Sequence, residues 1–102
     1  MKTGKLIREQ KLHKLSINVE FDDGDYSSLN TDNFRVLIDG ALGQVLGKSA
    51  PVVEILSFDS RTHRGCLAVA GRENVHIVWA ALSIYGVHFD RRVAIHLFSI
   101  QM

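Results

Sequence analysis

The clearest pattern in the chain is a strict alternation of apolar and polar residues near its start. The apolar members are Leu15, Ile17, Val19 and Phe21, and every residue between them is polar. A period of two is typical of a β-strand with one buried face, so we expect a strand over residues 13–21. The following stretch, residues 22–30, is rich in Asp, Gly and Ser and predicts a loop.

A second pattern, with apolar residues three and four positions apart, predicts a helix after this loop. Asn30 or Thr31 can serve as its N-cap, and Gly47 marks its end. Its apolar positions are Phe34, Leu37, Ile38, Ala41, Leu42, Val45 and Leu46. Two glycines inside it, Gly40 and Gly43, lower helix propensity, and we expect them to permit close packing of the helix on a sheet.

The second half of the chain predicts two strands, a second helix and a last strand. Residues 52–59 are rich in β-branched residues and are separated from residues 65–70 by a polar turn, which favours a hairpin. Residues 72–85 are expected to form the second helix, and residues 91–100 the last strand. The order β-α-β-β-α-β predicts an α+β fold, the ferredoxin-like βαββαβ sandwich, in which two helices cover one face of a four-stranded antiparallel sheet.

Composition and charge agree with one globular domain. The 102 residues are 46% hydrophobic and 23% charged, and no apolar run is long enough to span a bilayer. We expect a single ferredoxin-like domain over residues 13–102, preceded by a basic N-terminal arm over residues 1–12. The lone cysteine, Cys66, excludes an internal disulfide and a cysteine-based zinc site. A net charge of +1 is low for a domain that binds nucleic acid unaided.

No grouping of residues predicts catalysis, a metal site or a cofactor. The five histidines lack the spacing of a zinc site. The acidic cluster Asp22, Asp23 and Asp25 lacks the spacing and terminal glutamate of an EF-hand, which leaves a solvated loop. No serine, cysteine or carboxylate pair has a recognisable catalytic neighbour. We therefore expect no cofactor, and no enzyme activity of the chain on its own.

Residues 64–71, RGCLAVAG, correspond to the third-strand signature of RNA recognition motifs. Arg64 and Gly65 open the stretch as that signature requires, but its aromatic positions carry Cys, Ala and Gly. Such motifs bind RNA by stacking bases on these rings, so the chain is at most a degenerate example. Phe58 and Phe98 are the aromatic residues of other strands that can reach the same face. Alternatively, Arg64 and Gly65 end a hairpin turn in which glycine tolerates an unusual φ.

A longer stretch, VVEILSFDSRTHRGCLAVAGRENVHIVWAALSIYG, resembles the central region of the small ferredoxin-like protein subunits of ribonuclease P and ribonuclease MRP. It is most similar to their fourteen-kilodalton subunit. The shared features are the EILSFD strand, the polar hairpin, a short third strand and a helix containing WAALS, where Trp79 and Leu82 match positions that the family keeps apolar. The similarity is weaker over the rest of residues 13–100. The chain departs from the family near Ala68, where members often carry a basic residue.

The resemblance implies a non-catalytic subunit of a nuclear and nucleolar ribonucleoprotein. In that family the RNA catalyses removal of the five-prime leader from precursor tRNA, rRNA is also processed, and the small proteins assemble with one another and support the RNA. The implied partners are other ribonuclease P and MRP subunits, especially a paralogous ferredoxin-like subunit in a heterodimer, and the RNA, contacted directly or through them. The alternative is a free-standing ferredoxin-like ligand-binding or regulatory domain.

Two sets of residues are candidates for these contacts. One apolar face of the second helix is expected to pack on the sheet, with Trp79 in the core. A second apolar face is expected to bind the partner, and its residues are Ile77, Ala80, Ala81 and Ile84. The basic residues that can neutralise RNA phosphates are Lys2, Lys5, Arg8, Lys11, Lys14, Arg61, Arg64 and Arg72. Of these, we expect the N-terminal group to contact RNA first.

Overall fold

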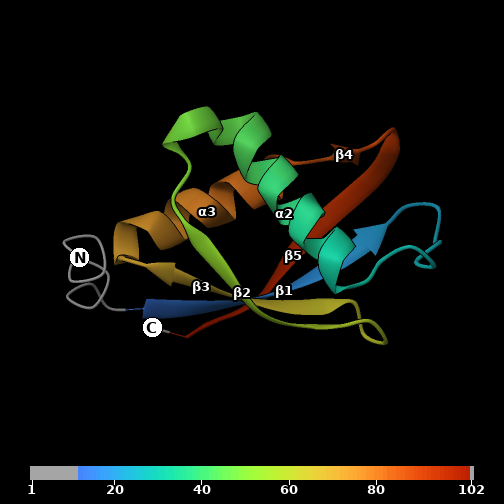
Figure 1. The fold of residues 1–102 in the computed structure, drawn as a ribbon, viewed down its shortest axis with the longest axis horizontal. Coiled ribbons are helices and arrows are strands. Elements are labelled where there is room, and N and C mark those ends of the chain that lie inside the picture. Colours follow the sequence, from blue (N-terminus) through green and yellow to red (C-terminus); the bar gives the residue numbers. More distant parts are fainter. Residues whose placement is uncertain (1–11, 102) are drawn as a thin grey trace.

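Two helices lie on one face of a curled antiparallel sheet, and no helix or strand of the described residues covers the other face, which is called the open face below (Figure 1). The computed structural model describes residues 12–101. The elements are β1 (Leu12–Phe21), α2 (Thr31–Leu46), the 3-10 turn η1 (Gly47–Ser49), β2 (Val53–Asp59), β3 (Arg64–Ala70), α3 (Arg72–Ile84), β4 (Val87–His88) and β5 (Arg91–Gln101). The order confirms the expected sequence of elements, with one strand added.

The strand order is β2-β3-β1-β5-β4, and every neighbouring pair is antiparallel. The four long strands have the ferredoxin-like order, so the predicted fold class is confirmed. The predicted number of four strands is wrong, because the two-residue strand β4 pairs with the start of β5. In the described part of the chain, no helix is long and apolar enough to cross a membrane.

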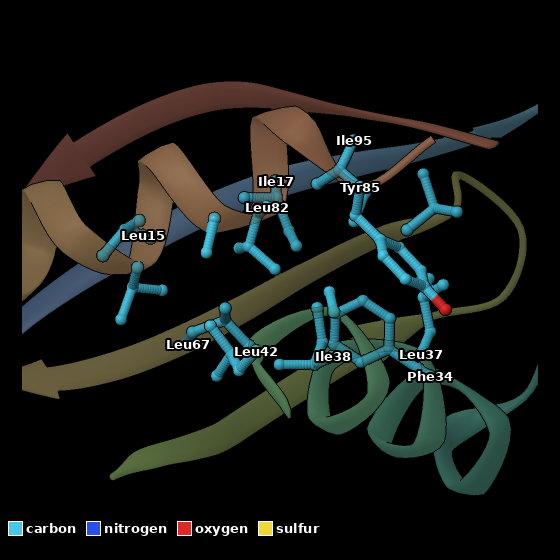
Figure 2. Packing of buried hydrophobic residues seen from close by; sticks show 14 of the residues in the cluster. Leu15, Ile17, Phe34, Leu37, Ile38, Leu42, Leu67, Leu82, Tyr85 and Ile95 are labelled. Carbon is cyan, nitrogen blue, oxygen red and sulfur yellow. The ribbon is translucent and has the colours of Figure 1, made fainter. Parts of the chain in front are cut away.

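The core lies between the helices and the sheet, and the alternation of β1 supplies its centre. Leu15 and Ile17 have no exposed surface, and α2 and α3 contribute Phe34 and Leu82 to the same buried cluster (Figure 2). Burying such a side chain stabilises the fold by about 1.5–3 kcal/mol. The N-cap of α2 is Asn30, whose side chain accepts a hydrogen bond from the Asn33 amide, as its capping position requires.

Register shifts in β2 and β5 change which side chains reach each face of the sheet, and the shift in β2 affects Phe58. In β2 the register shifts between Ile55 and Ser57, so that Phe58 pairs with Gly65 and faces the helices. Its ring stacks on Phe34 with centroids 4.6 Å apart. The expectation that Phe58 reaches the open face is therefore wrong, because the extra residue of the bulge reverses the alternation beyond it.

Gly65 is required by packing and not by a turn. It lies inside β3, and the left-handed backbone angle of the β2–β3 turn belongs to His63, with φ 61°. A Cβ on Gly65 would lie 2.1 Å from Cζ of Phe34, so the phenyl ring occupies the space of the missing side chain.

The expectation that the glycines of α2 permit close packing of this helix on the sheet is wrong. A Cβ on Gly40 would meet the Tyr85 hydroxyl at 3.4 Å, and one on Gly43 would meet nothing within 4 Å.

Candidate functional site

The basic residues proposed for RNA contact do not form one patch. Lys2, Lys5, Arg8 and Lys11 lie outside the described residues. Lys14 is opposite Ala68, and Arg72 begins α3 just after β3 ends, so both lie toward one end of the sheet. Arg61 and Arg64 lie at the β2–β3 turn, at the other end of β3, roughly 20 Å away for a strand of this length. The four described residues therefore mark two separate regions, and all four side chains are exposed.

The open face contains an exposed aromatic ring at Phe98, in contact with Arg64. The guanidinium carbon of Arg64 lies 3.7 Å from the ring centroid, and Phe98 is 57% exposed. Asp59 is the cross-strand neighbour of Arg64, yet no ion pair or hydrogen bond joins the Arg64 side chain to any other described residue. The guanidinium thus rests on the ring with its N–H donors available to a ligand.

A hollow of about 380 Å³ borders this pair on the open face. Besides Arg64 and Phe98, its lining includes Ser16, Ser57, Asp59, Thr62 and Cys66. Phe58 and Gly65 complete the lining, so small and polar residues surround the hollow together with two aromatic residues. The positions that carry rings in RNA recognition motifs carry none here, as the sequence predicted.

The β2–β3 turn beside this hollow is fixed to its neighbours by three contacts. Asn18 donates a side-chain hydrogen bond to the carbonyl oxygen of Thr62 at 2.9 Å, and the Val19 amide donates to the carbonyl oxygen of His63 at 2.9 Å. The His63 ring stacks on Tyr26 with centroids 3.6 Å apart. Arg64, the next residue, is consequently held at a defined place on the sheet.

The outer face of α3 carries most of the expected partner surface. Ile77 is 42% exposed, Ile84 is 69% exposed, and Ala80 is also exposed. Ala81 is only 1% exposed, so its assignment to this surface is wrong. It lies three residues after Val78, which places it on the helix stripe that packs on the sheet.

Trp79 differs from its expected place in the core. Its neighbours on the buried stripe, Val75, Val78 and Leu82, have no exposed surface. Trp79 itself is half-buried and packs against the edge of the core. The indole therefore lies between the two faces of α3.

The hairpin between β4 and β5 adds apolar surface that the sequence did not reveal. Val87 is 54% exposed and Phe89 is 79% exposed. Phe89 and Asp90 both have left-handed backbone angles, with φ 49° and 64°. A two-residue turn of this kind usually contains glycine. Because no glycine stands at these two positions, the sequence did not predict the hairpin. Phe89 also borders a hollow of about 200 Å³ that Val36 of α2 lines from the other side.

A hydrogen bond anchors this hairpin to α3. The Tyr85 hydroxyl and Nδ1 of His88 are 2.7 Å apart. Burial raises the pKa of Tyr85, and burial followed by the charge of Arg91 lowers the pKa of His88. Both groups are therefore held in their neutral forms near neutral pH. This contact between two neutral side chains has a structural role.

The acidic loop is fastened by Arg91. Nε of Arg91 donates to Oδ2 of Asp23 at 2.9 Å, and Nη2 of Arg91 donates to Oδ1 of Asp23 at 2.7 Å. The same Nη2 also donates to the backbone oxygen of Asp25. The guanidinium carbon also lies 4.0 Å from the ring centroid of Phe21. The hydrogen bond from Arg91 is the main reason that the pKa of Asp23 falls to about 2. A salt bridge thus joins the loop after β1 to the start of β5.

Over residues 12–101, no group of three or more His, Cys, Asp or Glu side chains is placed to hold a metal ion. His96 is close to a carboxylate, with Nε2 2.9 Å from Oε1 of Glu20, and this pair lies on the exposed surface of the sheet. Among the described residues, the candidate binding surfaces are the outer face of α3 and the open face of the sheet.

Comparison with known proteins bears on the fold. No family pattern matches the chain, and no curated protein matches it by sequence. Among solved structures, the chain is similar to a chain of the cryo-EM structure of yeast ribonuclease MRP, with a TM-score of 0.74 and 11% sequence identity. The match covers 90% of this chain and 74% of that chain. At such low identity the likeness establishes the fold, and the chain therefore shares its fold with a component of the yeast ribonuclease MRP structure.

Proposed function

We propose that the chain is a non-catalytic protein subunit of a ribonuclease MRP or ribonuclease P ribonucleoprotein. The observation that carries this proposal is the structural likeness to a chain of the yeast ribonuclease MRP structure, which covers 90% of this chain. The sequence resemblance to the fourteen-kilodalton subunit points to the same class of particle. In this role the chain supports an RNA that cleaves precursor tRNA or rRNA, and it resides in the nucleus and nucleolus.

The outer face of α3 is the surface through which the chain would join the particle. Ile77, Ala80 and Ile84 are exposed there, and Val87 and Phe89 follow closely along the chain. A surface helix of a monomer normally carries charge on its outer face, whereas after its first turn this helix has none. Removing such an apolar surface from water is favourable, and this drives association with another protein. We propose a related ferredoxin-like subunit as that partner.

The test is affinity purification of the tagged chain from cells, followed by mass spectrometry and RNA sequencing. We expect ribonuclease MRP or P proteins and their RNA to co-purify, and the particle to cleave precursor RNA while the chain stripped of RNA does not. Recovery of the chain as a homogeneous oligomer without RNA would contradict the proposal and favour a free-standing ligand-binding or regulatory domain.

A substitution tests the proposed partner surface in the same experiment. Ile84→Lys places a charge in the apolar surface at the C-terminal end of α3, where a cation is favourable for the helix itself. We expect loss of the partner proteins from the purified material. Val52→Lys is the matched control, since Val52 is 84% exposed beside β2, away from α3. Equal recovery of the partner with both variants would place the interface elsewhere.

A further inference from the structure

The Arg64 guanidinium contacts the Phe98 ring although a carboxylate is close by. A cation on the surface normally pairs with a nearby carboxylate, and Asp59 lies directly across from Arg64 in the sheet. The guanidinium instead covers the Phe98 ring at 3.7 Å, while the Asp59 carboxylate accepts a hydrogen bond from the Arg61 amide. The phenyl ring remains 57% exposed. Arg64 and Phe98 therefore present a flat cation and an aromatic ring to solvent on the open face.

The position of this pair depends on a β-bulge in the last strand. Leu97 and Ile100 of β5 both pair with helix-facing residues of β1, although they are three positions apart. Phe98 and Ser99 lie between them, so the bulge allows Ile100 to return to the core while Phe98 projects outward. Bulges are common at functional sites, where they redirect a side chain. Leu97 and Ile100, which flank Phe98 and Ser99, are partly buried against the core and fix the strand on both sides of the ring.

The surroundings of the pair suit RNA better than an apolar protein surface. Ser16, Ser57 and Thr62 line the adjoining hollow and supply hydroxyl groups that can donate to or accept from a base. Arg64 contributes a positive charge with free N–H donors. Two carboxylates of this face have hydrogen-bond partners: Asp59 accepts from the Arg61 amide, and Oε1 of Glu20 lies 2.9 Å from Nε2 of His96. A phosphodiester chain therefore meets a cation whose charge is not neutralised by any carboxylate of residues 12–101.

We infer that Phe98 and Arg64 form a stacking site for one unpaired base of single-stranded RNA on the open face of the sheet. This inference rests on the proposed role in a ribonucleoprotein and adds a direct RNA contact to it. The base stacks on the outer plane of the Arg64 guanidinium, whose inner plane rests on the Phe98 ring, and the free Arg64 donors bind the adjacent phosphate. The N-terminal basic residues can strengthen binding without selecting this position.

The first experiment measures binding of fluorescein-labelled octaadenylate to the full 102-residue chain by fluorescence anisotropy. We expect Phe98→Leu to weaken binding by about 5- to 150-fold, which is the range for loss of one stacked base, and Phe98→Tyr to retain it. Phe89→Leu is the matched control, because Phe89 is exposed on a different surface, at the β4–β5 turn. Equal affinity of the wild-type chain and Phe98→Leu, or equal weakening by Phe89→Leu, would overturn the inference.

Arg64→Lys separates stacking from charge. A lysine keeps the positive charge but lacks the guanidinium plane, so we expect weaker binding with an unchanged dependence on salt concentration. Arg64→Ala should weaken binding and also reduce the salt slope by about one. Arg61→Ala is the control for loss of charge, since Arg61 is on the same turn but points into solvent, with 90% of its side chain exposed. If Arg64→Lys binds as the wild-type chain does, the planar stack is not used and the inference is wrong.

Cys66 gives a readout that needs no substitution. It is the single cysteine of the chain and lines the hollow beside Phe98. We expect saturating octaadenylate to slow alkylation of the Cys66 thiol at least several-fold. Binding without such protection would show that RNA is held elsewhere, for instance by the N-terminal residues, and would overturn the inference. Protection by a partner protein instead of RNA would assign this face to protein contact and would also overturn it.

The two proposals fail separately. If the chain co-purifies with the ribonucleoprotein while Phe98→Leu binds octaadenylate normally, the stacking site is wrong and the subunit assignment stands. If octaadenylate protects Cys66 and Phe98→Leu abolishes binding, but the chain recovers no ribonuclease MRP or P components, the subunit assignment is wrong. The chain is then an RNA-binding domain of another assembly.

Discussion

At Gly65 the chain approaches its own core so closely that any side chain would collide with it. A Cβ there would lie 2.1 Å from Cζ of Phe34 and 2.9 Å from its Cε1 atom. Because Phe34 is fully buried, its ring has little room to move. We expect Gly65→Ala to lower the free energy of unfolding by about 1–3 kcal/mol, as overpacking of a core does. Urea denaturation measures this change.

Gly43 provides the control for that substitution, because it also lies within regular structure but is on the exposed side of α2, with free space around it. A Cβ on Gly43 meets no atom within 4 Å. Gly43→Ala should therefore raise the free energy of unfolding by about 0.5–1 kcal/mol through helix propensity alone. If both substitutions changed stability in the same direction, the contact between Gly65 and Phe34 would not be the reason for the glycine.

The ion pair between Arg91 and Asp23 predicts a dependence of stability on pH. The pKa of Asp23 is about 2 in the folded chain against an ordinary value of 3.8, chiefly because Arg91 donates to the carboxylate. A lowered pKa stabilises the fold above about pH 4, and the stabilisation is lost as the pH falls toward 2. In Arg91→Gln, we expect the pKa of Asp23 to rise toward 3.8, as measured by NMR titration of the carboxyl carbon.

Asp25 is the internal control for this titration. Its pKa is lowered mainly by hydrogen bonds from Ser27, and the charge of Arg91 contributes less. The pKa of Asp25 should therefore remain lowered in Arg91→Gln. If Asp23 kept a pKa near 2 without Arg91, the hydrogen bond would not be its cause.

At the scale of elements, regular periodicity was sufficient to predict most of the fold. The alternation of β1 and the three-and-four spacing of α2 and α3 gave these elements to within two residues of their observed ends. What periodicity cannot show is an interruption of its own pattern. The bulge between Ile55 and Ser57 turns Phe58 toward the helices, and strict alternation predicts the opposite face.

The candidate site was predictable residue by residue, but its assembly was not. Arg64 was identified as basic and Phe98 as able to reach the open face, yet their contact joins β3 to β5 across the intervening strand β1. Such a contact depends on strand register, which the bulge in β5 shifts. The β4–β5 hairpin was missed because Phe89 and Asp90 occupy turn positions where glycine or asparagine is the usual signal.

The half-buried position of Trp79 on α3 changes the expected cost of removing it. A fully buried Trp replaced by Ala usually lowers the free energy of unfolding by about 3–5 kcal/mol. Because part of the Trp79 side chain is exposed, we expect a smaller loss for Trp79→Ala. Leu82→Ala, at a site with no exposed surface, should lower it by about 2–5 kcal/mol.

Fluorescence provides an independent measurement, since Trp79 is the only tryptophan. Its emission maximum should lie between the values typical of buried and solvated indoles. It should shift toward shorter wavelengths when the partner protein binds α3, because binding would cover the exposed part of the ring. An unchanged maximum in the complex would indicate that the partner does not reach this side of the helix.

At the scale of the whole molecule, the ferredoxin-like layers separate the two proposed contacts. Both helices cover one face of the sheet, so the outer face of α3 and the open face with Phe98 point in opposite directions (Figure 1). A protein partner on α3 leaves the open face free for RNA. One small domain can therefore bridge a protein and an RNA within a particle, because each contact uses a different layer.

This separation predicts how the partner affects stability. A ligand that binds only the folded chain raises its free energy of unfolding by about 2.7 kcal/mol at one hundred times its Kd, which is roughly 10–20 °C in Tm for a domain of this size. We expect the partner recovered by co-purification to raise the Tm of the wild-type chain by that order. Ile84→Lys should abolish the rise while changing the Tm of the isolated chain little, because Ile84 is 69% exposed. Phe98→Leu should leave the rise intact, since its side chain is on the opposite face. If Phe98→Leu abolished the rise and Ile84→Lys did not, the assignment of protein to α3 and RNA to the sheet would have to be reversed.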